Sequence, residues 1–257
     1  MTDARDTMNG AARRRVVLIL QARMGSTRLP GKSLMPLAGK PLLYRILERV
    51  KRCRELDAIV VAIPDTAADE PLVKVAEAAG VSIFRGSEDD VLGRYTGAAR
   101  AHGADIVGRL PADNVTPEPS EIDRIADYHR GLSTPGFSSN LAQVFGNGYP
   151  DGIGAEMVDA SLLELAFEHN HRADQREHVH LNFFDYGKQA AVDPDWCAVS
   201  TIPCPAEFAR PDIALDVNTL EQYNLLSALY ADLYPVNPEF TIQDIVRWWD
   251  TRRPVKV

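Results

Sequence analysis

The first half of the chain alternates short apolar runs with amphipathic segments. The apolar runs predict buried strands at residues 16–20, 58–63, 81–84 and 104–110. Between them, apolar residues recur at helical spacing, which predicts helices over 41–50, 69–79 and 88–102. Pro41 suits a first helical position, and Gly80 and Gly103 suit the residues that follow a helix end. Strands that alternate with helices of this length predict crossover units and a largely parallel sheet.

The second half has a weaker pattern. Residues 119–129 predict an amphipathic helix, whereas residues 131–154 are rich in Gly, Ser and Asn and have few periodic apolar positions. We expect a segment of this length and composition to be a functional or disordered loop. Beyond it, the pattern predicts a strand over 155–158, a helix capped by Asp159 that runs through Phe167, a strand and helix over 213–223, and a closing helix over 240–251.

Size and composition narrow the class of protein. With 257 residues, 45% hydrophobic and 25% charged, the chain fits a single globular domain over residues 16–257, preceded by a flexible tail at 1–15. Its three cysteines lack C-x-x-C spacing, which argues against a disulfide framework and against a zinc site. We expect a cytoplasmic protein, because no apolar run approaches the ~20 residues of a membrane span and the start lacks a signal-peptide core. The net charge of -8 disfavours nucleic-acid binding.

Residues 21–32, here called the signature loop, carry the most distinctive chemistry. They follow the first predicted strand and contain two glycines, two hydroxyl residues, Arg23, Arg28 and Lys32, with no acid. Glu48 is the only acid between residues 13 and 54, although the chain as a whole is acidic. Glycine-rich backbone offers N–H donors to an anion, and arginine matches phosphate oxygens with forked donors. A polyphosphate site is therefore the hypothesis, against the alternative of an ordinary solvated loop. The P-loop and dinucleotide fingerprints are absent.

The string QARMGSTRLPGKSLMPLAGKPLL, residues 21–43, resembles the signature of the cytidylyltransferases of the spore-coat polysaccharide biosynthesis family. More distantly it is similar to CMP-Kdo and CMP-sialic acid synthetases. The resemblance implies that an A-R-x-x-S-x-R-x-P-x-K pattern wraps the triphosphate of CTP. In register with it stand Ala22, Arg23, Ser26, Arg28, Pro30 and Lys32, with Gly25 inside the same loop.

The same resemblance implies the fold. It is an α/β fold of the nucleotide-diphospho-sugar transferase (GT-A-like) type, with a Rossmann-like, mixed and mostly parallel sheet. A small insertion lobe at about 130–200 would cover the acceptor side of the cleft and take part in a homodimer. In such sheets, ligands bind beyond the carboxyl ends of the strands. The signature loop and the residues after the third and fourth predicted strands should therefore converge.

Asp113 follows the fourth predicted strand in the order Arg109-Leu110-Pro111-Ala112-Asp113-Asn114. From the residues alone, Asp113-Asn114 could be ordinary turn chemistry or a carboxylate that holds Mg²⁺ against phosphates. The spore-coat relatives usually show R-x-T-G-D-C here, so the resemblance implies a metal ligand at Asp113 and a nucleotide contact at Pro111. The residues between Arg109 and Asp113 differ from that pattern, which bears on the substrate.

Residues 84–95, FRGSEDDVLGRY, also resemble the spore-coat subgroup. In the wider family, the arginine after this strand and the start of the next helix border the cytosine. The resemblance therefore nominates Arg85, Asp90 and Val91 for the nucleotide. Ser87 and Asp89 are better explained as a helix cap and an acidic first turn that matches the helix dipole.

Three further stretches resemble acceptor-side or metal-binding segments of the family. Tyr149-Pro150-Asp151-Gly152 is similar to a Y-P-x-G stretch, and Arg176-Glu177-His178-Val179 matches an R-E-H-V motif. With Glu156, they nominate the acceptor-binding residues Tyr149, Asp151, Glu156, Arg176 and His178, although a lone histidine can also be structural. In IALDVNTLEQY, residues 213–223, the resemblance implies that Asp216 and Asn218 join Asp113 at the metal. Strand periodicity would place both side chains on one face.

The activity that the resemblance implies is CMP transfer from CTP to an acidic acceptor, with release of pyrophosphate and dependence on Mg²⁺. The acceptor would be a sugar acid or a small phosphonate or phosphate. Arg23, Lys32 and Asp113 would be the catalytic residues, and no general base is evident. One alternative is a glycosyltransferase, which predicts D-x-D where this chain has Asp113-Asn114-Val115. Another is a non-catalytic nucleotide-binding module, against which the intact basic residues argue.

Overall fold

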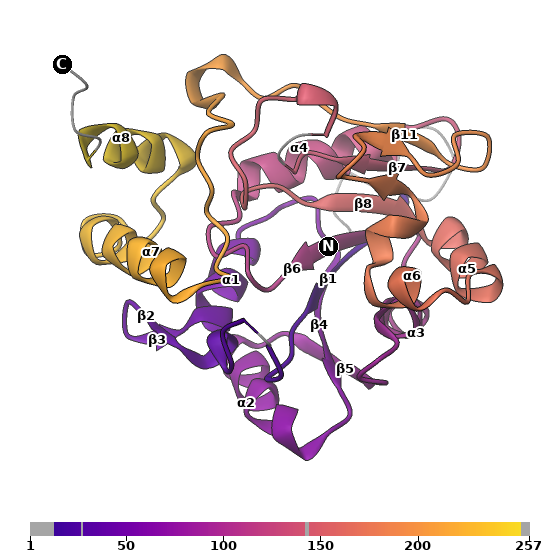
Figure 1. The fold of residues 1–257 in the computed structure, drawn as a ribbon, viewed down its shortest axis with the longest axis horizontal. Coiled ribbons are helices and arrows are strands. Elements are labelled where there is room, and N and C mark those ends of the chain that lie inside the picture. The colour runs from indigo at the N-terminus through magenta and orange to yellow at the C-terminus, as the bar shows by residue number, and fades with distance from the viewer. Residues whose placement is uncertain (1–12, 27, 142–143, 253–257) are drawn as a thin grey trace, which may run out of the picture.

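The computed structural model describes residues 13–26, 28–141 and 144–252. A seven-stranded sheet crosses the molecule in the order β11-β7-β8-β6-β1-β4-β5 (Figure 1). Neighbouring strands are parallel except for β8, which is antiparallel to both β6 and β7. The strands are β1 (Val16–Gln21), β4 (Ala58–Pro64), β5 (Ser82–Gly86), β6 (Ile106–Pro111), β7 (Gly136–Ser139), β8 (Glu156–Asp159) and β11 (Ala198–Ser200). The predicted mixed, mostly parallel α/β sheet is confirmed.

Helices cover both faces of this sheet, and each face has its own hydrophobic core. One core contains residues of α1 (Leu42–Val50), α2 (Glu70–Ala79), α4 (Pro119–Arg130), α7 (Leu220–Leu233) and α8 (Ile242–Arg252). The other contains residues of α3 (Val91–Ala101) and α5 (Ala160–His169), with the short α6 (Ala173–Glu177) beside α3. Along β1, Leu18 and Leu20 enter the first core and Val17 and Ile19 the second. A strand buried on both faces explains why this segment is a continuous apolar run.

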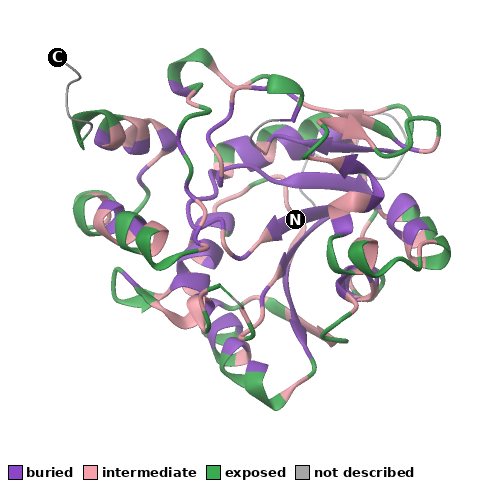
Figure 2. Cartoon of the chain, viewed as in Figure 1, coloured by how far each residue is buried: buried purple, intermediate pink, exposed green. Residues whose placement is uncertain are grey.

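Figure 2 shows the central strands buried along their length, while α2, α5 and α7 present exposed outer faces. Small two-stranded ribbons pair β2 (Pro36–Leu37) with β3 (Lys40–Pro41) and β9 (Phe184–Asp185) with β10 (Ala190–Ala191). Short 3-10 helices lie at Lys32–Leu34, Ala67–Asp69, Val144–Gly146, Val179–Asn182 and Ala206–Phe208. Among the described residues, no helix has both the length and the apolar character that crossing a membrane requires.

Most predicted elements of the first half form within a few residues of their predicted bounds, but two segments of the second half differ from their predicted secondary structure. Residues 131–154 contain β7, which is fully buried in the central sheet. The sequence of β7 is only weakly apolar. Its Ser138 is buried, and the hydroxyl of Ser138 is satisfied by a hydrogen bond to Nδ1 of His129 at 2.7 Å. The strand predicted near 213–217 is reduced to isolated bridges, from Asp216 to Asn114 and from Ala214 to Asp151.

Asp159 begins α5 as predicted, but its carboxylate does not cap the helix. It accepts hydrogen bonds from the backbone N–H of Gly136 (2.8 Å) and from Nε2 of His129 (3.1 Å), and it pairs with Arg14. Asp159 thus joins α4, β7 and the start of the described chain, which sequence periodicity could not indicate. Similarly, Pro41 precedes α1 by one residue instead of occupying its first position.

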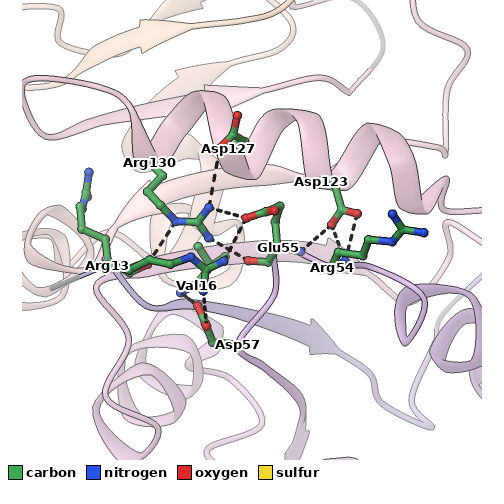
Figure 3. Close-up of polar contacts among 9 residues, drawn as sticks. Arg13, Val16, Arg54, Glu55, Asp57, Asp123, Asp127 and Arg130 are labelled. Carbon is green, nitrogen blue, oxygen red and sulfur yellow. Dashed lines mark hydrogen bonds and ion pairs between the residues drawn. The ribbon is translucent and has the colours of Figure 1, made fainter. Parts of the chain in front are cut away.

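Ion pairs fix the start of the described chain (Figure 3). Of the segment predicted as a flexible tail, residues 1–12 lie outside the described residues. Arg13 pairs with Glu55 at 2.9 Å and with Asp57 at 2.7 Å, and Asp57 also accepts from the backbone N–H of Val16. Arg130 of α4 reaches the same Glu55 at 2.6 Å. These contacts anchor the N-terminal end of β1.

The segment predicted as an insertion at about 130–200 is divided between the sheet and its edge. Its strands β7, β8 and β11 belong to the central sheet. Of the remainder, α5 contributes aliphatic side chains to the second core, and Phe183 stacks on Phe137 of β7 at 5.6 Å and on Trp196 at 5.5 Å between ring centroids. The segment therefore rests directly on the sheet, next to the carboxyl end of β6.

Candidate functional site

A cavity of about 300 Å³ lies at the carboxyl ends of β1 and β6. The signature loop forms one wall, and the start of α3, the end of β6 and residues 177–178 form the others. The predicted site residues that line it are Ala22, Arg23, Ser26, Arg28, Lys32, Val91, Pro111, Asp113 and His178. It is called the nucleotide-side cavity below, because most of these residues were predicted to bind the nucleotide. The signature loop and the end of β6 thus converge as the parallel sheet predicts, whereas residues 85–87, which were also expected there, do not line this cavity.

Hydrogen bonds hold the signature loop against the segment that leads into α2, residue 27 lying outside the described residues. The backbone N–H of Met24 donates to Asp69 at 2.7 Å, and Asp69 is fixed in turn by the hydroxyl of Thr66 at 2.6 Å. Gly31 has a φ of 70°, and its N–H donates to the carbonyl of Met24 at 3.2 Å. Because this left-handed conformation favours glycine, Gly31 allows the chain to turn into the 3-10 helix that begins at Lys32.

Lys32 ties the loop to two distant segments. Its ammonium lies 3.2 Å from Asp113, 2.8 Å from the carbonyl of Val217 and 3.3 Å from Oδ1 of Asn218. Arg28 donates to the same oxygen of Asn218 at 2.6 Å. The Lys32 side chain is only 14% exposed, so its charge is partly shielded from water. Two cations of the signature loop therefore bond to predicted metal ligands.

The three predicted metal ligands lie in one cluster. The backbone N–H of Val217 donates to the carbonyl of Asp113 at 2.9 Å, and the side-chain amide of Asn218 donates to Asp216. Within the described ranges, no group of three or more His, Cys, Asp or Glu side chains is arranged to hold a metal, so this set is two carboxylates and one amide. Hard oxygen donors of this kind suit Mg²⁺, which usually keeps water or substrate phosphate in its remaining positions. The cluster already accommodates one cation, because oxygens of Asp113, Val217 and Asn218 contact the Lys32 ammonium.

Arg94 of α3 adds a cation that the sequence analysis did not single out. It is 2% exposed, lines the nucleotide-side cavity and donates to the carbonyls of Glu88 (2.9 Å) and Ser87. Burial lowers the pKa of its guanidinium, and the nearby charge of Arg23 lowers it further. Arg94 lies within the motif-bearing stretch 84–95, which was the available signal.

Asp90 and Arg176, predicted for nucleotide and acceptor respectively, are paired with each other at 3.0 Å. Asp90 caps α3 and accepts from the backbone N–H of Gly93 at 2.8 Å. The cap was predicted at Ser87, three residues earlier. Arg176 donates to the carbonyl of Phe167 at 3.0 Å and stacks over its ring. Neither lines the nucleotide-side cavity. Their contacts support the first turn of α3, which carries Val91 into that cavity.

Three other nominated residues also lie away from the nucleotide-side cavity. Arg85 pairs with Asp65 at 3.0 Å and with Glu70 at 2.8 Å. Tyr149 is fully buried, and its hydroxyl donates to Glu121. Gly25 lies in the signature loop, and a Cβ there would meet Glu88 at an ordinary 3.6 Å.

A second cavity of about 310 Å³ adjoins the first. Both are lined by Arg109, Pro111 and Asp113, so the end of β6 forms the wall between them. The predicted residues Asp151, Glu156 and Asp216 line it together with Asn114, Leu141, His180 and Tyr186. It is called the acceptor-side cavity below, after the predicted acceptor residues Asp151 and Glu156. Arg109, His180 and Tyr186 were not nominated from the sequence. Arg109 stood inside a quoted motif, whereas no motif marked His180 or Tyr186.

The acceptor-side cavity contains a buried ion pair. Arg109 and Glu156 lie 2.6 Å apart, and Glu156 also accepts from the hydroxyl of Tyr186 at 2.7 Å. Burial opposes the charge of Arg109, but the carboxylate of Glu156 outweighs it and raises the pKa of the guanidinium. Burial lowers the pKa of His180 to about 4, so this imidazole is neutral at pH 7. Burial and the charge of Asp216 raise the pKa of Asp151.

Fold and site together define an α/β nucleotide-binding enzyme, with a basic loop at the strand ends and a second cavity beside it. The family described as Cytidylyltransferase matches residues 17–189, and the chain belongs to this family. It is a CTP-dependent nucleotidyltransferase. The family and the mixed α/β architecture expected from the resemblance are thereby confirmed.

Individual relatives agree with this assignment. The chain is 32% identical over 220 residues to the spore coat polysaccharide biosynthesis protein SpsF of Bacillus subtilis, covering 84% of this chain and 86% of the relative. It is 39% identical over 120 residues to a 3-deoxy-manno-octulosonate cytidylyltransferase of Anaeromyxobacter sp. strain K, covering 46% of this chain and 48% of the relative. A solved cytidylyltransferase from Leptospira borgpetersenii superposes with a TM-score of 0.81 at 26% identity, covering 95% of this chain and 100% of that one.

Proposed function

We propose that this enzyme transfers CMP from CTP to a sugar acid and releases pyrophosphate, with Mg²⁺ as the metal. The observation that carries the proposal is the pair of adjoining cavities that share Arg109, Pro111 and Asp113. A basic cavity suits a triphosphate, and the cavity across the shared wall would hold the group that attacks it.

The nucleotide would bind in the first cavity. Arg23, Arg28 and Lys32 line it and would neutralise the triphosphate, stabilising the charge that develops on the departing pyrophosphate. Val91, at the first turn of α3, would border the base. Since Lys32 and Arg28 bond to Asn218 in the structure, we expect both side chains to turn toward the phosphates when CTP enters.

Asp113, Asp216 and Asn218 would hold Mg²⁺ against the phosphates. When bound there, the ion would supply positive charge beside the α-phosphate and the acceptor oxygen. Two carboxylates and an amide form a small donor set, so this chain's residues would bind the ion most strongly together with CTP.

The acceptor would bind in the second cavity, near Asp151 and Glu156. Its hydroxyl oxygen would attack the α-phosphorus in line, forming the new O–P bond while the bond to the β-phosphate oxygen breaks. The pyrophosphate leaves with the electron pair of that bond, and the hydroxyl proton passes to solvent. A sugar acid is supported by the similarity to a 3-deoxy-manno-octulosonate cytidylyltransferase over 46% of the chain.

Pyrophosphate release tests the proposal. Wild-type enzyme would be assayed with CTP, Mg²⁺ and a panel of Kdo, N-acetylneuraminate, small phosphonates and phosphate esters, with UTP, ATP and GTP as nucleotide controls. We expect turnover with CTP and a sugar acid, and none with Asp113→Ala. The matched control Asp89→Ala changes an exposed aspartate that lines neither cavity and should retain activity.

Other outcomes separate the alternatives. Turnover only with a phosphonate or phosphate ester would retain the CTP chemistry and replace the acceptor. Release of a nucleoside diphosphate from a nucleotide sugar would indicate a glycosyltransferase. Failure to bind CTP would contradict the assignment of the signature loop. The homodimer stays a prediction, which light scattering coupled to size-exclusion chromatography would test.

A further inference from the structure

We propose that Arg109 binds the acidic group of the acceptor and thereby determines which acceptors the enzyme uses. This inference rests on the proposed function, because it takes the second cavity as the acceptor site. Arg109 is not among the residues that the sequence motifs nominated for binding. Its assignment comes from its place in the sheet and from the charges around it.

The sheet holds Arg109 in one orientation. Arg109 of β6 stands directly opposite Glu156 of β8 in the antiparallel register, and the two side chains pair at 2.6 Å. Arg109 is 8% exposed and Glu156 1%. The second oxygen of Glu156 accepts from Tyr186 at 2.7 Å, and the Tyr186 hydroxyl lies 3.2 Å from that of Ser139. A guanidinium fixed from one side in this way is preorganised for a ligand on its other side.

Part of the guanidinium is left without a partner. Its hydrogen bond to Glu156 comes from Nη1. Nε is buried with no hydrogen-bond partner, and among the described residues none accepts from Nη2. Unsatisfied buried donors of a charged group are costly, so an incoming oxyanion that accepts from them is favoured. Arg109 lines both cavities, so it belongs to the shared wall where, in the proposed function, the acceptor would meet the α-phosphate.

The charges of the acceptor-side cavity make Arg109 the necessary counter-ion. In the part of the chain that the structure describes, it is the only lysine or arginine lining this cavity. The same cavity is also lined by four acidic residues, Asp113, Asp151, Glu156 and Asp216. The imidazole of His180 is neutral at pH 7, because burial lowers its pKa to about 4. An acidic acceptor would therefore be repelled from this cavity unless its charge meets Arg109 or a metal.

The same arrangement favours one kind of acid. A guanidinium edge matches a planar carboxylate, whereas a phosphonate or phosphate monoester would bring a second negative charge toward the same carboxylates. We therefore expect Arg109 to select carboxylate acceptors over dianions. Asp151, which lines the same cavity, offers an acceptor for the hydroxyls of a sugar.

The test separates acceptor binding from nucleotide binding. Because Arg109→Gln alone would leave Glu156 buried without its counter-ion, the principal variant is the double substitution Arg109→Gln/Glu156→Gln, which keeps the pair neutral. Arg109→Lys keeps the positive charge but lacks the paired N–H donors of the guanidinium. The matched control is Arg100→Gln, which removes an exposed arginine on α3 that lines neither cavity. Steady-state kinetics would use CTP with Kdo, N-acetylneuraminate and 2-hydroxyethylphosphonate, and calorimetry would measure CTP binding.

We expect the double variant to raise the KM for the carboxylate acceptor about tenfold or more, as loss of a charge-assisted hydrogen bond predicts, with CTP affinity unchanged. Arg109→Lys should fall between wild type and the double variant, and preference for the carboxylate over the phosphonate should decline in both. A normally folded double variant with an unchanged acceptor KM would overturn the inference, as would an equal loss of CTP affinity. So would a wild-type enzyme that binds CTP but uses neither carboxylate. A wild-type enzyme that binds no CTP would refute the proposed function itself.

Discussion

Replacing Lys32 by Met should strengthen the binding of a divalent cation in the absence of nucleotide. In the structure the Lys32 ammonium bonds to Asp113 and Asn218, two of the proposed metal ligands, and to the carbonyl of Val217. A metal that arrives without CTP must displace this ammonium. Methionine has similar length and no charge, so the substitution removes the competitor and leaves the carboxylates in place.

The distances set the size of the effect. An ammonium and a carboxylate 3.2 Å apart attract by about 5 kcal/mol at an effective dielectric constant of 20. The Asp113 side chain is 25% exposed, so hydration of the separated charges offsets most of that attraction. A net competition of about 1–2 kcal/mol remains, which corresponds to an affinity gain of roughly 5–30-fold. CTP affinity should fall in the same variant, because Lys32 is then missing from the triphosphate site.

Mn²⁺ provides the assay, because the electron paramagnetic resonance signal of the free hydrated ion reports how much is unbound. Wild type, Lys32→Met and the control Lys74→Met, an exposed residue of α2, would be titrated without nucleotide. Adding Asp113→Asn to Lys32→Met should abolish the gain. Unchanged or weaker Mn²⁺ binding by Lys32→Met would refute the idea that the ammonium occupies the metal site.

Three further predictions concern residues outside the two cavities. Tyr149→Phe removes the hydroxyl that bonds to buried Glu121 and should lower the free energy of unfolding in urea by about 1–3 kcal/mol without changing the KM for CTP; a raised acceptor KM at unchanged stability would instead support the predicted acceptor contact. Burial lowers the pKa of His129 to about 3, so only the unfolded state takes up a proton at this residue as the pH falls below about 6.5. Between pH 6 and 4, the free energy of unfolding of wild type should therefore fall more steeply than that of His129→Gln, by up to about 1.4 kcal/mol per pH unit. Parallel pH profiles would contradict this. Gly154→Ala places a Cβ 2.4 Å from the carbonyl oxygen of Asn140 and should cost about 1–3 kcal/mol, seen as a lower melting temperature; an unchanged one would mean that the backbone yields freely there.

The sequence predicts best those parts of the fold whose burial depends on apolar side chains. β1 and β4 are buried on both faces and therefore read as continuous aliphatic runs. β7 is buried as completely, yet two of its four residues are serines satisfied by His129 and Tyr186. A strand stabilised by side-chain hydrogen bonds from distant residues has no hydrophobic pattern of its own, so it could not be predicted.

The same distinction applies to the site. The signature loop is contiguous, so its basic residues can be identified from sequence, and the resemblance adds Asp113, Asp216 and Asn218. The place of Arg109 against Glu156 depends on the register of β6 and β8, which no local pattern fixes. Asp90 and Arg176 each belong to a motif, but the motifs do not indicate that these two residues pair with each other.

The bonds of Lys32 also have a consequence for the growing polypeptide. Lys32 is separated by 81 residues from Asp113 and by 185 from Val217, so its three partners leave the ribosome at very different times. Contacts of such sequence separation close large loops and form late in folding. A nascent chain that ends before residue 216 already contains the signature loop but lacks two of the three oxygens that its lysine needs. The cleft is therefore completed only after residue 218 has been synthesised, and chains that end earlier would carry a basic loop with an incomplete counterpart.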